Sequence, residues 1–419
     1  MMPSPAWHHA PLPSCMIISS PTVNPTARHK TMADSILTVN AGSSSIKFAL
    51  FEHAGDAHRV MGQIDGIGVR THMKIKGQAG ETLFDEDLDG ADDHHASLAA
   101  ILRWFEANIP DMIIAAVGHR VVHGGVKYAE PVKVTAEIAD DLEGLRSLAP
   151  LHQPHNIAGI RAAMANFPNA LQVACFDTAF HRQHPFVNDT FALPHHFYEE
   201  GVRRYGFHGL SYEFISEELK RVAPMHAAGR VVVAHLGNGA SMAAIQDGKS
   251  IGSTMGFSAL DGLPMGTRCG QIDPGVLLYL MQEKGMNADE ISDLLYKQSG
   301  LKGMSGVSND MRALEASSDP RADQAIDYFV FRIRRELGGL TAVLGGIDAL
   351  IFTGGIGENS ARIRERVASG SEWMGLALDS ARNKAGDTII SNEVSRARIM
   401  VLRTNEEAMI ARHTRAHLG

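Results

Sequence analysis

The sequence predicts an α/β protein with two duplicated domains that face each other across a central cleft. At 419 residues, the chain is long enough for two domains with a full hydrophobic core each. Apolar runs typical of strands alternate with segments of helical periodicity. Two similar Gly-rich hairpins occur in opposite halves of the chain, which indicates an internal duplication.

The first hairpin covers residues 36–50, ILTVNAGSSSIKFAL. An apolar run ends at Asn40, and a second run begins at Ile46 after a turn of small residues. Such a turn presents backbone N–H groups and hydroxyls that suit an anion such as phosphate, and Lys47 adds a positive charge. It is not a Walker P-loop, because no Gly-Lys-Ser/Thr opens a helix here. An ordinary hairpin with a polar turn is the alternative for this segment alone.

The second hairpin, residues 231–245, reads VVVAHLGNGASMAAI. Aligning Leu37 with Val232 places Asn40 over His235, so the two turns correspond. Two phosphate-binding hairpins across a cleft are the arrangement of the actin and sugar-kinase superfamily of phosphotransferases. This parallel concerns the fold alone.

Composition is that of an ordinary globular enzyme, with 44% hydrophobic and 21% charged residues. The net charge of -8 argues against a nucleic acid or an anionic membrane as partner. No apolar run approaches the roughly 20 residues of a membrane span. The three cysteines lack metal-ligand spacing and fit a reducing cytoplasm.

Residues 1–33 are rich in Pro, His and Ser and predict a disordered N-terminal extension. Met32 is therefore an alternative start to Met1. Residues 60–88 predict further strands and turns, and residues 96–109 an amphipathic helix. His94 and His95 precede that helix, and we interpret them as solvated polar residues rather than ligands.

Residues 113–122 predict a strand that contains Arg120 in a run of valines between glycines. A buried guanidinium needs a partner, so Arg120 either binds an anionic ligand, which we favour, or forms a structural ion pair. After a turn at 149–156 and a helix at 157–165, the strand 171–176 leads into Asp177. Ligands of α/β sheets bind beyond the carboxyl ends of strands, which makes Asp177 a site candidate, with a cap of the next turn as the alternative.

His208 lies between glycines, near two arginines and ahead of a helix beginning near Ser211. The Gly-rich segment 252–270 has neither helical nor strand periodicity, and such a loop inside a domain is usually functional. Residues 323–344 predict a long helix that belongs to the core or to a subunit interface.

Residues 349–352 predict a strand, followed by a Gly-rich turn over 353–359 and a helix, an order typical of nucleotide binding. Residues 398–402 form the last predicted strand, ahead of a terminal helix. Thr404 and Glu407 have the spacing of a capping box, which leaves Glu406 as the freer carboxylate for a metal.

The chain resembles the acetokinase family of short-chain carboxylate kinases. The motifs that carry the resemblance follow the family's order from residue 36 to the C-terminus: NAGSSSIKF, GHRVVHGG, FDTAFH, YGFHG, HLGNGAS, MGTRCGQIDPG, SNDMR, FTGGIGEN and TNEE. The resemblance implies two ribonuclease H-like domains of the actin-like ATPase fold, a cytoplasmic homodimer, and ATP-dependent conversion of acetate to acetyl phosphate. We place the N-terminal domain at 34–177 plus 407–419 and the nucleotide-binding domain at 178–406.

Residue roles also follow from the resemblance. Asn40 and Glu406 match positions associated with Mg²⁺, for which Mn²⁺ is the alternative ion. Arg120 matches the arginine that holds the substrate carboxylate, and Asp177, His208 and Arg268 match the catalytic residues. The matches to the ATP/ADP-binding positions are Lys47, His235, Leu236, Gly237, Asn238, Gly239, Asp310, Met311, Arg312, Gly355, Ile356, Gly357, Glu358 and Asn359.

The chemistry explains these residue types. Acetate is already an anion at pH 7 and needs no general base, so catalysis depends on positioning and charge neutralisation. Arg120 and Arg268 can clamp planar oxygens, while His208 and the metal take up charge on the moving phosphoryl group. We therefore interpret Asp177 as an orienter rather than a base.

The acyl pocket of the family is a small apolar set, which Val122, Leu151 and Phe207 match. A fourth position, commonly proline, is Ala259 here. The smaller side chain leaves room for about one more carbon, and a methylene is worth only about 0.8 kcal/mol. Acetate is the predicted substrate and propionate the alternative.

Other classes fit the sequence less well. A sugar kinase needs an acid-rich sugar pocket, and a chaperone a separate peptide-binding domain. A filament protein needs no arginine-rich cleft. A Rossmann dehydrogenase is excluded because TGGIGEN does not match the dinucleotide fingerprint.

Overall fold

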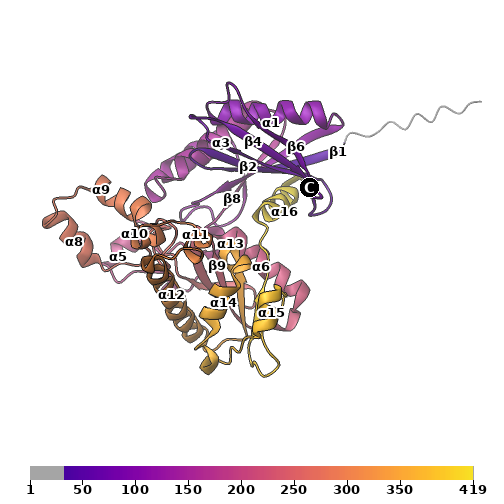
Figure 1. Cartoon of the computed structure of the whole chain (residues 1–419). Helices are drawn as coiled ribbons and strands as arrows, with labels where there is room; N and C mark the ends of the chain where they lie inside the picture. The colour runs from indigo at the N-terminus through magenta and orange to yellow at the C-terminus, as the bar shows by residue number, and fades with distance from the viewer. Residues whose placement is uncertain (1–32, 419) are drawn as a thin grey trace, which may run out of the picture.

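The computed structural model describes residues 33–418, which form an α/β protein with two sheets (Figure 1). The predicted N-terminal extension lies outside the described residues, except for Ala33, the first residue of β1. No helix among the described residues is both long and apolar enough to cross a membrane.

The first sheet has the strand order β5-β4-β3-β2-β1-β6-β8-β7. Its strands are β1 (Ala33–Ala41), β2 (Ser45–Glu52), β3 (His58–Asp65), β4 (His72–Gly77), β5 (Thr82–Asp87), β6 (Met112–Val121), β7 (Val132–Lys133) and β8 (Leu171–Phe176). Strands β1, β6 and β8 run parallel, and β1 to β5 form an antiparallel meander. The predicted hairpin is confirmed, with Asn40 opposite Lys47.

The second sheet has the order β11-β10-β9-β12-β13. Its strands are β9 (Arg230–Leu236), β10 (Ala240–Gln246), β11 (Lys249–Ser253), β12 (Ala349–Thr353) and β13 (Arg398–Val401). Here β9, β12 and β13 are parallel while β9 to β11 are antiparallel, so this sheet repeats the order β3-β2-β1-β6-β8 of the first. The duplication inferred from the hairpins is therefore visible in the topology.

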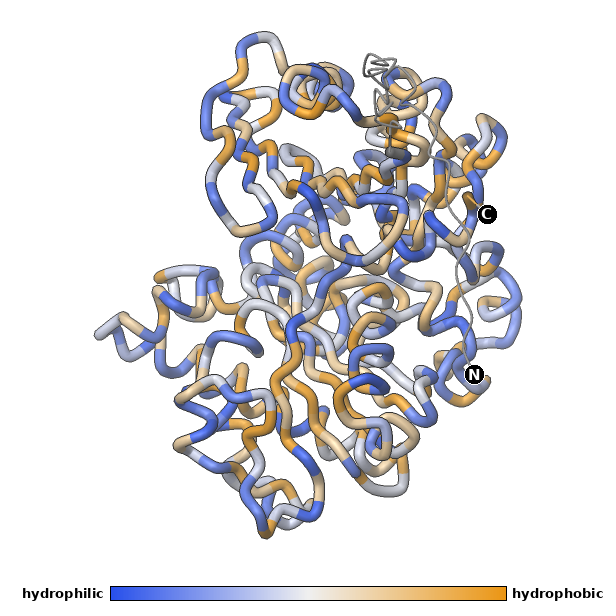
Figure 2. The backbone as a smooth tube through the Cα atoms, turned by 90° about the vertical axis from the view of Figure 1, so that its right-hand side faces the viewer, coloured by the Kyte–Doolittle hydropathy of each residue, from blue (hydrophilic) through white to orange (hydrophobic). Residues whose placement is uncertain are grey.

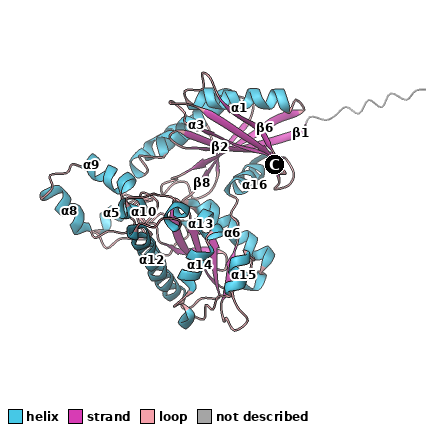
Figure 3. Cartoon of the chain, in the orientation of Figure 1, coloured by secondary structure: helices cyan, strands magenta, loops and turns pink. Residues whose placement is uncertain are grey.

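Helices cover both faces of each sheet (Figure 3). In the first sheet, α1 (His94–Asn108) and α3 (Gln153–Asn166) pack on one face, and α16 (Glu406–Leu418) packs on β1, β6 and β8. In the second sheet, α12 (Pro320–Leu344) and α6 (Gly209–Val222) cover opposite faces. In the lower part of Figure 2, hydrophobic stretches of the chain run through the interior. This is expected where helices cover both faces of a sheet.

Shorter elements connect these layers. The helices are α2 (Ala136–Glu143), α4 (Phe186–Asp189), α5 (His195–Glu199), α7 (Pro224–Ala227), α8 (Pro274–Gln282), α9 (Ala288–Asp293), α10 (Gly300–Ser305), α11 (Met311–Glu315), α13 (Gly354–Asn359), α14 (Ala361–Ala368) and α15 (Ser380–Ala385). Single turns of 3-10 helix are η1 (Gly144–Leu148), η2 (Ala179–His181) and η4 (Glu372–Met374), and η3 (Leu294–Gln298) is a π-helical turn.

Several local expectations were wrong. The segment 353–359, expected as a turn, is helical from Gly354, and α3 begins at Gln153 within the expected turn. The capping box at Thr404 is absent, because the Asn405 side chain caps α16 by accepting a hydrogen bond from Ala408 N at 2.9 Å. His94 is not simply solvated, since its Nε2 lies 2.7 Å from the Gly42 carbonyl oxygen in the first hairpin turn.

The carboxyl ends of the central parallel strands of both sheets carry the predicted site residues. Asn40 and His235 occupy matching places, each one residue before the end of its strand. The domain boundaries themselves stay a proposal: 34–177 plus 407–419 for the first domain and 178–406 for the second. The packing of α16 on the first sheet supports this division.

The contact between α16 and β6 gives a test of how tightly this helix is seated. A Cβ atom on Gly118 would overlap Thr414 Oγ1 and lie 2.6 Å from Ile410 Cγ2. We expect Gly118→Ala to lower the free energy of unfolding by about 1–3 kcal/mol in urea titrations, through overpacking. The control is Gly144→Ala, because nothing lies within 4 Å of a Cβ there. If both substitutions changed the free energy of unfolding equally, α16 would not be packed closely against β6.

Candidate active site

The centre of the site is an ion pair between Arg120, at the end of β6, and Asp177, just beyond β8. Arg120 Nε lies 3.0 Å from Asp177 Oδ1, and Nη2 lies 2.6 Å from Oδ2, a bidentate pair. Asp177 is buried, and its backbone N–H donates to the Val121 carbonyl at 3.0 Å. The adjacent parallel strands thus set the position of both charged groups.

Further oxygens surround the same guanidinium. Arg120 Nη1 lies 3.3 Å from Asn40 Oδ1, and Nε lies 3.7 Å from Glu406 Oε2. Burial lowers the pKa of Arg120, but the neighbouring carboxylates outweigh it and raise the pKa overall. Burial also raises the pKa of the Glu406 carboxyl. The alternative reading of Arg120 as an ion-paired residue therefore holds in this structure, and ligand binding by its partly exposed side chain stays a prediction.

Asn40 and Glu406 offer two hard oxygen ligands, each in contact with Arg120. Among the described residues no group of three or more His, Cys, Asp or Glu side chains could hold a metal ion. Mg²⁺ commonly takes only one or two protein oxygens and completes its shell with water and substrate phosphates. The donor set therefore fits Mg²⁺ held together with a nucleotide.

His208 caps α6 with a left-handed backbone, φ 58°, which is rare for a residue with a side chain. Its ring stacks on His235 at a centroid distance of 4.3 Å, and Nδ1 lies 2.8 Å from Ser241 Oγ. Burial lowers the pKa of His208 well below its usual value, with further lowering by His235 and the two arginines. The imidazole is therefore neutral at physiological pH.

His208 and Arg268 meet at Gly239 in the second hairpin turn. A Cβ on Gly239 would lie 3.2 Å from His208 Nε2 and 3.3 Å from Arg268 Nη2. A side chain at this position would be in tight contact with both groups, and glycine leaves them room to approach the turn. The structure brings these predicted residues together from the α6 cap, the loop after β11 and the β9–β10 turn.

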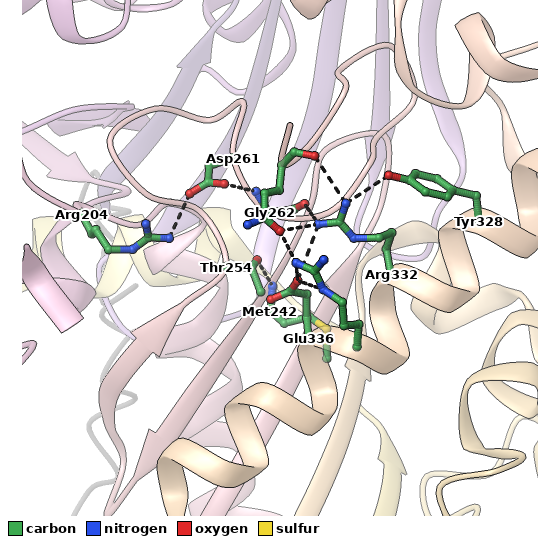
Figure 4. Close-up of polar contacts among 10 residues, drawn as sticks. Arg204, Met242, Thr254, Asp261, Gly262, Tyr328, Arg332 and Glu336 are labelled. Carbon is green, nitrogen blue, oxygen red and sulfur yellow. Dashed lines mark hydrogen bonds and ion pairs between the residues drawn. The ribbon is translucent and has the colours of Figure 1, made fainter. Parts of the chain in front are cut away.

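The loop that carries Arg268, residues 252–270, is fixed by hydrogen bonds within the loop and to α12. Arg268 Nη1 donates to the Ala259 carbonyl at 2.9 Å, and burial lowers the pKa of Arg268. The buried Arg332 of α12 donates to the Gly262 carbonyl at 3.3 Å (Figure 4). It also donates to the Gln271 side chain at 2.9 Å. The loop is therefore an ordered part of the core.

An ion pair joins this loop to the segment that bears His208. Arg204 Nη2 lies 2.9 Å from Asp261 Oδ2 (Figure 4), and Tyr205 N donates to the Gly256 carbonyl at 3.0 Å. The two segments with candidate catalytic residues are thereby connected through both side chains and backbone.

The predicted acyl pocket is partly assembled. Val122 and Phe207 are buried in one hydrophobic cluster, against which the partly buried Ala259 packs. Leu151 is half-buried in the turn before α3 and is not a member of that cluster. Its part in the pocket stays a prediction.

A cavity of about 710 Å³ is lined by residues of the second hairpin turn and of the segments 309–315 and 355–360. Predicted nucleotide-binding residues that line it are Gly237, Asn238, Asp310, Met311, Arg312, Gly355, Ile356 and Asn359. The other predicted residues in this domain do not line the cavity: His235, Leu236, Gly239, Gly357 and Glu358. Glu358 has a structural contact instead, as its Oε1 accepts from Gly354 N at 3.0 Å and Thr404 N at 3.2 Å.

Lys47 does not line this cavity, and its side chain is exposed on β2. It lines a separate hollow with Gln63, Lys76 and Glu407. Its predicted contact with ATP stays a prediction.

The sequence reasoning missed four residues. Asn309, Glu315 and Ser360 line the cavity, and two of them are neighbours of predicted residues in the motifs SNDMR and FTGGIGEN. His152 lies near both arginines, and its pKa is lowered to about 4 by burial and then by Arg268 and Arg120. Its signal in the sequence was its place in the segment LHQPH, next to Leu151.

The two sheets share a five-strand order, and the carboxyl ends of their central strands lie at one site. These features define a phosphotransferase of the duplicated actin-like ATPase fold. The Acetokinase family model matches residues 35–412. The chain belongs to the acetokinase family, kinases that transfer a phosphoryl group to a carboxylate and use ATP/ADP.

Similar proteins of known name and structure support this family assignment. Acetate kinase of Methylocella silvestris is 59% identical over 399 residues, covering 92% of this chain and 98% of the relative. The crystal structure of Porphyromonas gingivalis acetate kinase has a TM-score of 0.85 at 37% identity, covering 92% of this chain and 100% of that one. The crystal structure of a propionate kinase from Francisella tularensis has a TM-score of 0.87 at 37% identity, covering 91% of this chain and 99% of that one.

The Arg120–Asp177 pair predicts the behaviour of Asp177→Asn. An orienting residue leaves partial activity, so we expect a specificity constant about tenfold to a hundredfold lower with an unshifted pH optimum. The control is Asp189→Asn, since Asp189 is also buried and paired with an arginine, Arg182 at 3.1 Å. Loss of one titrating limb from the pH–rate profile of Asp177→Asn would instead identify a base.

Proposed function

We propose that this chain catalyses reversible transfer of the γ-phosphoryl group of ATP to acetate, giving acetyl phosphate and ADP. The observation that carries the proposal is the partly exposed Arg120 guanidinium, held by Asp177 near Arg268 and His208 and beside the cavity lined by Gly237 and Gly355. The name of the Methylocella silvestris relative supports acetate as the substrate.

The residues of the site have complementary tasks in this reaction. The acetate oxygens bind Arg120 and are already deprotonated, so no proton needs to be removed before attack on phosphorus. Arg268 places a positive charge where the transferred group becomes more negative. The neutral His208 ring directs Nε2 to the same place, and its Nδ1 contact with Ser241 orients it.

Asp177 acts through Arg120. Its carboxylate accepts hydrogen bonds from Arg120 Nε and Nη2 and so fixes the orientation of the guanidinium toward the substrate. Burial raises the pKa of Asp177, and the Arg120 charge opposes that rise. An acid-base role is not needed, because acetate brings no proton to the reaction.

Mg²⁺ is the proposed metal, with Mn²⁺ as the alternative ion, and Asn40 and Glu406 would hold it. Bound with the nucleotide, it would neutralise charge on the phosphate oxygens. The contacts of both residues with Arg120 keep their oxygens at the same end of the site.

The acyl pocket leaves propionate as a second substrate. Ala259 packs against the cluster of Val122 and Phe207, and its small side chain favours one extra methylene compared with proline. Apolar pockets discriminate weakly between such homologues.

The test is hydroxylamine trapping of acyl phosphate with ATP, Mg²⁺ and acetate, propionate or butyrate. We expect strong product with acetate, product with propionate within about a hundredfold in specificity constant, and little with butyrate. Ala259→Pro should raise the acetate preference about fourfold, the equivalent of one methylene. No acyl phosphate from any acid would overturn the proposed function and leave the fold standing.

A cytoplasmic homodimer is the proposed state. The free thiols of Cys175 and Cys269 suit a reducing compartment. Helix α8 has no buried residue, although it is largely apolar, with Leu278 54% and Tyr279 48% exposed. It projects from the body with α9 (Figure 1), where a second copy of the chain would cover it.

This surface can be tested directly. We expect Leu278→Arg to weaken the dimer at least about thirtyfold in sedimentation velocity, because a charge would enter an apolar contact. The control is Met225→Arg on α7, where Met225 is 89% exposed. An unchanged dimer in Leu278→Arg would place the interface elsewhere, and a monomeric wild type would refute the dimer.

A further inference from the structure

A buried histidine outside the proposed catalytic set holds the backbone next to His208. His181, the last residue of η2, is fully buried, and its Nε2 lies 3.0 Å from the Phe207 carbonyl oxygen. Its Nδ1 lies 2.7 Å from Ser250 Oγ in β11, and that hydroxyl lies 2.8 Å from His184 Nε2. Three side chains thus form a chain of hydrogen bonds that ends on the Phe207 peptide.

Only one arrangement of protons satisfies these contacts. A carbonyl oxygen can only accept, so His181 Nε2 carries the hydrogen and Nδ1 presents a lone pair. The Ser250 hydroxyl therefore donates to His181 and accepts from His184 Nε2. Both rings are neutral, because burial lowers the pKa of His181 to about 3 and that of His184 to about 4.

The held peptide leads directly into the site. The Phe207 side chain belongs to the predicted acyl pocket, and the next residue, His208, has a left-handed backbone. Gly209 N donates to the Asp177 carbonyl at 2.8 Å, so contacts on both sides hold this segment. A strained conformation at a non-glycine residue persists only where its surroundings determine it.

The glycine before Phe207 shows how close the ring lies. A Cβ on Gly206 would lie 2.6 Å from the Cγ and Cδ2 atoms of His181. Gly206 also has a positive φ of 73°, so a side chain there would be strained as well as crowded. The His181 ring and the segment 206–209 are therefore packed as one unit.

We propose that His181 is a positioning residue that holds the Phe207–His208 peptide, with Ser250 and His184 selecting its tautomer. The proposal rests on the proposed function, since it gives His208 a task in phosphoryl transfer. A shift of the peptide would move the Phe207 ring and the His208 imidazole together. Loss of the hydrogen bond should therefore affect turnover and acyl selectivity, and leave the nucleotide cavity unaffected, since neither Phe207 nor His208 lines it.

The first test compares His181→Phe with His181→Gln. Phenylalanine keeps a ring without a donor, whereas glutamine keeps an N–H that can reach the Phe207 carbonyl. We expect His181→Phe to lower kcat for acyl phosphate formation about tenfold to a hundredfold, with KM for ATP within about twofold of wild type. His181→Gln should recover most of kcat, and the acetate-to-propionate ratio should change only in the phenylalanine variant.

The second test leaves the ring in place. Ser250→Ala removes the hydroxyl that donates to His181 Nδ1, so the Nδ1–H tautomer becomes accessible. In that tautomer the Nε2 lone pair faces the Phe207 carbonyl oxygen and the hydrogen bond is lost. We expect kcat to be about threefold to tenfold lower. The control is Ser371→Ala, a buried serine whose hydroxyl donates to the Val367 carbonyl at 3.0 Å, far from these residues in the sequence. Its kcat should equal that of wild type.

NMR of ¹⁵N-histidine-labelled enzyme identifies the tautomer of His181 independently of catalytic activity. We expect the Nε2–H signature for His181 in the wild type and a mixture in Ser250→Ala. An Nδ1–H tautomer in the wild type overturns the inference whatever the activity. Wild-type kcat in both His181→Phe and Ser250→Ala, with His208→Ala impaired, overturns it as well. Absence of acyl phosphate from the wild type contradicts the proposed function instead.

Discussion

The structure of the site depends on the cost of burying a guanidinium. Arg120 lies in the largely apolar strand β6, where an unpaired charge would be strongly destabilising, and it is balanced by Asp177 and Glu406. Those two carboxylates come from the end of β8 and the start of α16. One electrostatic requirement therefore brings together segments that lie far apart in the sequence.

The duplicated sheets contribute different chemistry from equivalent places. Asn40 and His235 correspond in the two hairpins, yet Asn40 lies among charged groups while His235 stacks on another neutral imidazole. Burial lowers the pKa of His235 to about 4. Neutral rings can donate hydrogen bonds to phosphate oxygens without adding charge to a site that already holds two arginines. At equivalent places, the first sheet thus carries an amide among charged groups and the second sheet a neutral imidazole.

Local patterns in the sequence predicted the hairpins, the strands and the residues at strand ends, because alternation and turn residues report directly on backbone structure. The helix cap was placed one residue early, since Thr404 and Asn405 are both good capping residues and only the backbone path decides between them. His152 and Glu315 were missed for another reason. They reach the site through tertiary packing, and no spacing in the chain reports on such contacts.

Under the proposed function, acyl selectivity and catalysis depend on different atoms of Ala259. Its side chain packs against the apolar cluster that contains Val122 and Phe207, whereas its backbone carbonyl accepts the hydrogen bond from Arg268. Proline, which is common there in the family, would supply the same carbonyl with a bulkier side chain. A change between the two residues therefore alters the room for the acyl chain while the acceptor for Arg268 is kept. Under the proposed function, selectivity can therefore shift at this loop while the hydrogen bond from Arg268 to the carbonyl of residue 259 is kept.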